Sequence, residues 1–118
     1  MDKPRLHHEK LDVYQVSIAF LSLALAVASE CPRGHAFLGD QLRRAASSIV
    51  LNIAEGCGKR TAADRRRFYD IARGSTHECG AIFDVGEKMG MIGGEVHEEG
   101  KTLLVRIAQM LSKLRGGD

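Results

Sequence analysis

The 118-residue sequence contains no tryptophan, and its aromatic residues make up only 5% of the chain. A hydrophobic core must therefore be built from aliphatic side chains and alanine, which favours helices packed closely through small residues. Hydrophobic residues still account for 44% of the chain, so the composition is not that of a disordered protein. The length is typical of one domain.

Proline and cysteine are also scarce. The only prolines are Pro4 and Pro32, so no proline can interrupt a helix after residue 32. The three cysteines, Cys31, Cys57 and Cys79, are odd in number and include no C-x-x-C pair. This pattern argues against a disulfide framework or a zinc knuckle and predicts a cytoplasmic protein.

The longest apolar run, residues 16–28, is shorter than the roughly 18 residues that suggest a membrane span. It ends in Ala26-Val27-Ala28 like the core of a signal peptide. The preceding fifteen residues mix basic with acidic side chains, whereas a leader begins with a short, purely basic segment. We therefore expect this run to form the first helix of a folded domain, without a membrane partner.

Charge is small in total but uneven along the chain. The net charge is +2, too small by itself to indicate a nucleic-acid-binding protein. Residues 33–73 contain nine Lys/Arg and four Asp/Glu, whereas residues 74–100 contain one and six. A basic half beside an acidic half suits polyanion binding or head-to-tail self-association, unless the two halves are ordinary solvated faces.

Helical periodicity recurs four times, and alternating strand patterns are scarce. The sequence predicts an all-α fold with helices over about residues 9–30, 36–55, 61–89 and 95–114. Short connections make neighbouring helices antiparallel, which predicts an up-down-up-down four-helix bundle spanning residues 1–118 as one domain. Thr61 is expected to start the third helix in an approximate capping box, and Gly56 is expected to end the second.

The first helix is apolar on two faces. A helix of this kind needs cover on more than one face, and a small bundle supplies one. We therefore expect a second copy of the chain to cover the other face. One face carries Val13, Val16, Phe20, Ala24 and Val27, and the other Leu11, Ile18, Leu21, Leu25 and Ala28.

Two glycines, Gly74 and Gly80, lie inside the third helix. Each costs about 1 kcal/mol relative to alanine in a helix. Because the small Ala72 and Ser75 flank Gly74, we expect a neighbouring backbone to approach closely there.

Residues 52–61, NIAEGCGKRT, resemble a phosphate-binding loop. The Walker pattern requires Gly at position 53 and Ser or Thr at position 60, after a strand. The sequence has Ile53 and Arg60, and the preceding segment is predicted to be helical. The Walker hypothesis therefore fails.

A weaker anion site remains at the start of the third helix, because a helix N-terminus presents free N–H groups and a partial positive charge. The alternative is that nearby acidic residues, Glu55, Asp64 and Asp70, neutralise the cations locally. The cations at this position are Lys59, Arg60, Arg65, Arg66 and Arg67.

No catalytic or metal-binding set can be assembled from the sequence. His77 and Cys79 would point to different sides of one helix, and neither H-E-x-x-H nor an i, i+4 histidine pair occurs. No Ser–His–acid set is evident. We expect no enzymatic activity, no cofactor and no metal.

Polar residues near the core stripes of the second and third helices predict a structural network. Ser48 and Asn52 are four residues apart, and Gln41 and Ser75 are equidistant from Gly58, about which the helices fold back. Buried polar groups need partners, so the network would fix helix register without chemistry. Its six candidate members are Gln41, Ser48, Asn52, Glu55, Ser75 and Glu78.

The segments QLRRAASSIVLNIAEG (residues 41–56) and FYDIARGSTHE (residues 68–78) resemble a known bacterial family. These are the four-helix-bundle proteins first noticed as reading frames within intervening sequences of large-subunit ribosomal RNA genes. The accessory variability protein of diversity-generating retroelements is a relative. The resemblance implies a homopentameric barrel of four-helix bundles without established catalytic residues. For the retroelement relative, it implies binding to a reverse transcriptase and, through a basic surface, to nucleic acid. The matching positions are Gln41, Arg44, Ala45, Ala46, Ser48, Ile49, Asn52, Ile53, Ala54, Glu55, Gly56, Phe68, Ala72, Gly74, Ser75 and Glu78.

The leading hypothesis is a non-enzymatic oligomer that binds RNA or DNA through phosphate contacts. Few aromatics are available for stacking on bases, which argues against single-strand readout. The alternative is a protein–protein scaffold or an accessory subunit, for example of a reverse transcriptase, without direct nucleic-acid binding. The candidate nucleic-acid-binding residues are Arg43, Arg44, Lys59, Arg60, Arg65, Arg66, Arg67 and Arg73.

Overall fold

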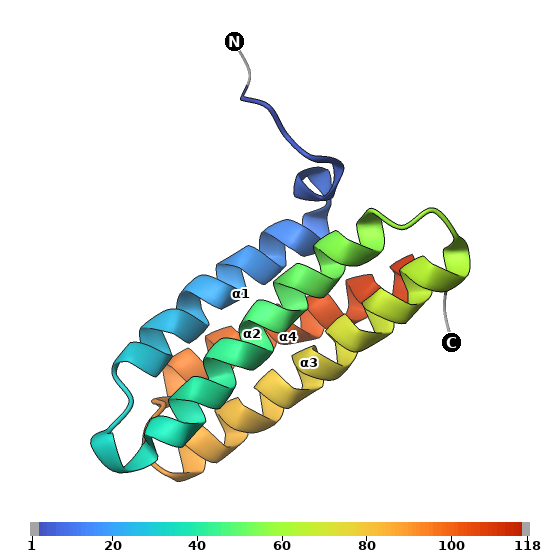
Figure 1. Ribbon diagram of the computed structural model, residues 1–118. Helices are drawn as coiled ribbons and strands as arrows, with labels where there is room; N and C mark the ends of the chain where they lie inside the picture. The colour runs from blue at the N-terminus through green and yellow to red at the C-terminus, as the bar shows by residue number, and fades with distance from the viewer. Residues whose placement is uncertain (1–2, 117–118) are drawn as a thin grey trace.

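The computed structural model describes residues 3–116, which contain helices and no strand. Each long helix packs beside the next in the chain, and α4 returns to contact α1, so the four helices form an antiparallel bundle (Figure 1). The all-α, four-helix prediction is confirmed. The elements are η1 (His7–Lys10), α1 (Asp12–Ser29), η2 (Arg33–His35), α2 (Ala36–Cys57), α3 (Ala62–Lys88) and α4 (Gly94–Leu114).

The chain enters the bundle through the short 3-10 turn η1. The sequence predicted a first helix that starts near residue 9, whereas α1 begins at Asp12. Glu9 holds the turn apart from the helix: its carboxylate accepts the backbone N–H of Leu6, and its carbonyl accepts a hydrogen bond from Gln15 Nε2 at 2.8 Å. The N-terminal segment therefore has a defined direction relative to α1.

The connection between α2 and α3 differs in one detail from the prediction. The helix continues through Gly56 to Cys57, so the expectation that Gly56 ends it was wrong. A Cβ atom on Gly56 would lie 2.8 Å from Cε1 of Tyr69, so this glycine allows the Tyr69 ring to pack. The third helix starts as predicted, because Thr61 Oγ1 accepts the backbone N–H of Asp64 at 3.1 Å.

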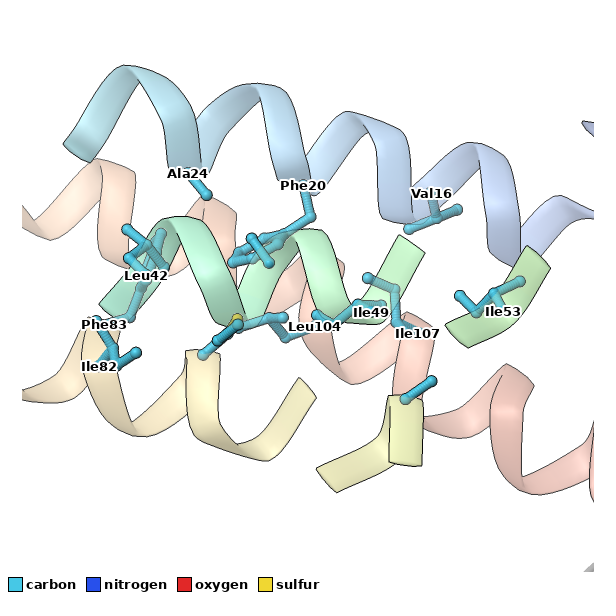
Figure 2. Close-up of a cluster of buried hydrophobic side chains, with 14 of the residues drawn as sticks. Val16, Phe20, Ala24, Leu42, Ile49, Ile53, Ile82, Phe83, Leu104 and Ile107 are labelled. Carbon is cyan, nitrogen blue, oxygen red and sulfur yellow. The ribbon is translucent and has the colours of Figure 1, made fainter. Parts of the chain in front are cut away.

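The core is centred on two aromatic rings from diagonally opposite helices. Phe20 of α1 and Phe83 of α3 are fully buried, and their ring centroids lie 5.4 Å apart. Aliphatic side chains from all four helices surround them, as the low aromatic content required (Figure 2). Those labelled in Figure 2 are Val16, Ala24, Leu42, Ile49, Ile53, Ile82, Leu104 and Ile107.

The two glycines inside α3 do not mark a close backbone approach. A Cβ atom on Gly74 would have no neighbour within 4 Å, and one on Gly80 would meet only Nζ of Lys101, at 3.9 Å. The expectation of close packing at these positions was therefore wrong. Both lie on the outer part of α3, where alanine would fit.

Close approaches occur instead at Gly86 and Gly100. A Cβ atom on Gly100 would lie 2.1 Å from Cε2 of Phe83, and one on Gly86 would lie 2.7 Å from Cδ1 of Ile92. These two glycines let α4 and the α3–α4 connection lie against the core. Gly90, with φ of 76°, adopts the left-handed conformation that follows the end of α3.

The helix α1 is apolar well beyond the side that it buries. Asp12 is its only charged residue, and Phe20, Ala24 and Ala28 face the core. Of the expected second face, Ala28 is buried in the bundle, Leu25 is 45% exposed, and the rest are half-buried. The exposed side has no charge after Asp12. It consists of Gln15, Ala19, Ser22, Leu25, Ala26 and Ser29.

By length and hydropathy, α1 could also cross a membrane. The core helix of a bundle passes the same test, and 33% of α1 is buried against the other helices. Its buried side chains are those that fill the bundle core, which agrees with the expected role as the first helix of a folded domain.

Candidate functional site

One end of the bundle carries a cluster of cations. The antiparallel arrangement brings together the start of α1, the α2–α3 connection and the end of α4, and both chain termini emerge there (Figure 1). Acidic residues near this end are fewer, namely Asp12 at the start of α1, Glu55, Asp64 and Asp70. We call this surface the basic end. Its cations are Lys59, Arg60, Arg65, Arg66, Arg67, Lys113 and Arg115.

Arg65 supports the α2–α3 connection from inside. Its Nη1 donates to the carbonyl oxygens of Lys59 at 3.1 Å and Arg60 at 2.9 Å. The side chain is half-buried. Arg65 therefore fixes the conformation of the connection, and its guanidinium is already engaged.

Lys59 and Arg67 lie near the ring of half-buried Phe68. Lys59 Nζ lies 5.0 Å and Arg67 Cζ 5.4 Å from the ring centroid, within cation–π range. Lys59 also pairs with Glu55 at 3.1 Å, whereas Arg67 makes no ion pair within residues 3–116. The ring of Phe68 thus contacts one cation from the α2–α3 connection and one from the start of α3.

Arg66, Asp70 and Arg115 join the start of α3 to the end of α4. Arg115 donates to both carboxylate oxygens of Asp70, with 3.1 Å between Nη2 and Oδ2, and Arg66 Nε donates to the Arg115 carbonyl at 3.0 Å. The hydrogen bond from Arg115 lowers the pKa of Asp70 below its ordinary value. The carboxylate therefore stays charged and offsets part of the positive charge here.

The side chain of Arg60 is exposed on the connection. Within the described part of the chain, it forms no ion pair or side-chain hydrogen bond. An arginine in this state can present its planar fork of N–H donors to a phosphate group. Arg60 and Arg67 are thus the cations of this end best placed to contact an external anion.

Of the remaining predicted cations, Arg43 and Arg44 lie away from the basic end. Arg43 and Arg44 precede Gly58 by about 15 residues, which is roughly 20 Å along a helix. Arg43 pairs with Asp40 at 2.8 Å, whereas Arg44 is exposed. Arg73 is half-buried, and its buried Nε has no hydrogen-bond partner within residues 3–116. The eight candidates therefore do not form one continuous patch.

The opposite end of the bundle is acidic. Asp84 of α3 is bound by Lys101 Nζ at 2.9 Å and by His97 Nε2 at 2.8 Å. These contacts lower its pKa, the hydrogen bond from His97 contributing most. Exposed carboxylates at the start of α4 have no such partners within residues 3–116, so the bundle has opposite charges at its two ends. They belong to Glu95, Glu98 and Glu99.

Three of the six expected network residues meet between α2 and α3. The hydroxyl oxygens of Ser48 and Ser75 lie 2.8 Å apart, and Asn52 Nδ2 donates to Ser48 Oγ at 3.0 Å and to the Ser48 carbonyl at 2.9 Å. All three are half-buried. The hydrogen bond between Ser48 and Ser75 favours one axial register of α2 relative to α3.

The other three network candidates lie outside this cluster. Gln41, Glu55 and Glu78 are exposed, and within residues 3–116 no hydrogen bond joins them to it. The partner of Ser75 is Ser48, seven residues after Gln41. The helices therefore do not fold back symmetrically about Gly58.

Lys113 and Arg115 were missing from the sequence-based set. The signal that could have found them is the predicted antiparallel order, since it places the end of the fourth helix beside the second connection. Within residues 3–116, no group of three His, Cys, Asp or Glu residues could hold a metal ion.

Comparison with models of known protein families matches residues 9–113 to the 23S rRNA-intervening sequence proteins. The match begins in η1 and ends one residue before the end of α4. Among curated proteins, no sequence matches the chain.

Proposed function

The chain belongs to the 23S rRNA-intervening sequence protein family, and we propose that it is a non-enzymatic cytoplasmic protein that binds nucleic acid through its basic end. The observation that carries the proposal is the surplus of cations at this end, where Arg60 and Arg67 are exposed and have no acidic partner within residues 3–116. Three free cysteines fit a reducing compartment.

The interaction would be made with the phosphate backbone. Lysine and arginine contacts to phosphates release counterions and carry little sequence information. The ring of Phe68 is half-buried and already contacted by Lys59 and Arg67, so it is not a free platform for base stacking. Binding should therefore be salt-sensitive and tolerant of sequence.

Filter binding tests the proposal. A labelled RNA and a DNA of the same sequence are incubated with the full chain over a series of salt concentrations. The proposal expects retention at low salt and a linear fall of log Kobs with log salt concentration. If neither RNA nor DNA is retained on the filter at low salt, the protein does not bind nucleic acid and the proposal is wrong.

We further propose that copies of the chain associate through the exposed side of α1, as in the pentameric barrel that the family resemblance implies. This side presents Ala19, Ser22, Leu25 and Ala26 to solvent without a charged residue among them. Depletion of charged residues is typical of the core of a contact between proteins. Association would repeat the basic end in every copy, which strengthens binding to a polymer through multivalency.

The competing function is that of a scaffold or accessory subunit, for example of a reverse transcriptase, without nucleic-acid binding. The opposite charges at the two ends of the bundle favour it, because they suit docking between proteins. In that case charge reversal at Arg60 and Arg67 would change capture of a protein partner and leave nucleic-acid affinity unaltered.

A further inference from the structure

A second basic surface lies outside the four helices, in the N-terminal segment. Lys3, Pro4, Arg5, Glu9 and Lys10 line a cleft of about 580 Å³. We call it the N-terminal cleft. The N-terminal segment that lines it lies at the same end of the bundle as the α2–α3 connection and projects away from the helices (Figure 1).

The segment that forms this cleft is held by specific contacts. The Glu9 carboxylate accepts the Leu6 N–H, and Gln15 Nε2 donates to the Glu9 carbonyl at 2.8 Å. The rings of His8 and Tyr14 meet edge to face, with centroids 4.7 Å apart. The 3-10 turn η1 also packs against both α1 and α2. The cleft is therefore anchored beside the basic end.

The charge of the cleft is unbalanced. Its three cations, Lys3, Arg5 and Lys10, form no ion pair within residues 3–116. Among residues 3–116, Glu9 is the only acid that lines the cleft, and its carboxylate is used within the turn. Three cations around a concave space favour an anionic occupant with several oxygen acceptors, such as a phosphate group.

We propose that the N-terminal cleft is a second phosphate-binding site, which contacts the backbone of the same nucleic acid as the α2–α3 connection. This inference rests on the proposed function. Two cationic surfaces on separate elements at one end suit a polymer of dense, regular charge; duplex DNA carries one charge per about 1.7 Å of its axis. A single small anion would need only one of them.

The test compares two triple variants of the full chain. Lys3→Gln/Arg5→Gln/Lys10→Gln removes the cleft cations, and the matched control Arg33→Gln/Lys88→Gln/Arg106→Gln removes three exposed cations elsewhere. The probe is a fluorescein-labelled 20-nucleotide RNA, alone and as a duplex, and anisotropy is measured over a salt series. Because each phosphate contact contributes about 0.7 (single strand) to 0.9 (duplex) to the salt slope, the cleft variant should lose up to about 2.1–2.7 units of slope and the control less than one.

Lysine acetylation followed by mass spectrometry gives a second readout on the unaltered chain. Bound RNA should protect Lys3 and Lys10 and leave Lys88 reactive.

Equal salt slopes for the two triple variants, with Lys3 and Lys10 still reactive in the complex, would show that the N-terminal cleft is not a phosphate-binding site. The proposed function would not be affected by that result. If the unaltered chain binds no RNA at low salt, both proposals fall together. Protection with the short anion tripolyphosphate equal to that with RNA would instead indicate a small-anion site, and would also overturn the inference.

Discussion

Gly100 of α4 lies directly against the ring of Phe83 on α3. A Cβ atom at position 100 would come within 2.1 Å of Cε2 and 2.6 Å of Cδ2 of that ring. The Phe83 ring is fully buried and packs on Phe20, so it cannot move aside without disturbing the centre of the core. The spacing of α3 and α4 thus depends on the absence of one methyl group.

Replacing Gly100 by alanine should destabilise the protein. Overpacking of a filled core costs about 1–3 kcal/mol, which exceeds the gain of roughly 1 kcal/mol from better helix propensity. Urea unfolding followed by circular dichroism would show a lower midpoint. A Gly100→Ala variant as stable as the parent would mean that α4 lies farther from Phe83 than described.

The matched control is Gly74, which also lies inside a helix but has no atom within 4 Å of an added Cβ. Gly74→Ala should raise the free energy of unfolding by about 0.5–1 kcal/mol, because only helix propensity changes. The two substitutions are chemically identical, so opposite signs would isolate the packing contribution at Gly100.

These glycines also show what the sequence predicts and what it does not. Apolar periodicity and short connections were sufficient to predict four antiparallel helices from the sequence, because both are local properties. A glycine inside a helix has the same local signature whether it faces solvent, as Gly74 does, or a ring, as Gly100 does. The difference is set by which side chain the neighbouring helix presents, and that depends on register.

The hydroxyl pair between Ser48 and Ser75 should make a measurable contribution to register. The double-mutant cycle of Ser48→Ala and Ser75→Ala isolates their interaction, expected at about 0.5–1.5 kcal/mol for a half-buried hydrogen bond. Asn52 donates to Ser48 Oγ at 3.0 Å, so Ser48→Ala should cost more than Ser75→Ala. A coupling energy near zero would show that water replaces the contact without loss.

The contact between Asp70 and Arg115 should make stability depend on pH in the acidic range. The pKa of Asp70 is lowered in the folded state, so its stabilising contribution is complete above the unfolded value of about 4 and is lost as the pH falls through the folded value. Because the Asp70 side chain is 44% exposed, solvent screening limits the contribution to roughly 0.2–1 kcal/mol.

Urea unfolding between pH 7 and pH 2.5 measures this effect. Asp70→Asn should be less stable than the parent at pH 7, and the difference should shrink as the pH falls below about 4. Asp84→Asn offers a comparison, since His97 and Lys101 lower the pKa of Asp84 in the same direction at the other end of the bundle. A constant difference between parent and Asp70→Asn across the range would contradict a charged contact.

The exposed side of α1 predicts a specific effect on self-association. Leu25→Glu places a charge on the uncharged surface and should shift sedimentation toward the monomer. Val85→Glu is a matched control, since Leu25 and Val85 are both 45% exposed and Val85 lies on α3. Association through α1 would be contradicted if the parent sediments as a monomer at micromolar concentration. It would also be contradicted if the Leu25→Glu and Val85→Glu variants both sediment as oligomers of the same size.

The candidate site illustrates the limit of reasoning from charge along a sequence. The cluster of cations after Gly58 was visible as a run of residue types, but their partners were not. Arg65 turns inward to the carbonyls of Lys59 and Arg60, whereas Arg60 itself stays open. Which arginine is engaged depends on the backbone of the connection, and that is fixed only when α2 and α3 pack.

If phosphate groups are contacted at the basic end, removing cations there must weaken the salt dependence of RNA binding. Arg60→Gln/Arg67→Gln is compared with Arg33→Gln/Lys88→Gln, which removes the same charge at sites away from the basic end. The first variant should lose up to about 1.5 units of the slope of log Kobs against log salt concentration, while the second keeps the parental slope. Equal slopes for parent and both variants would contradict phosphate contacts at the basic end.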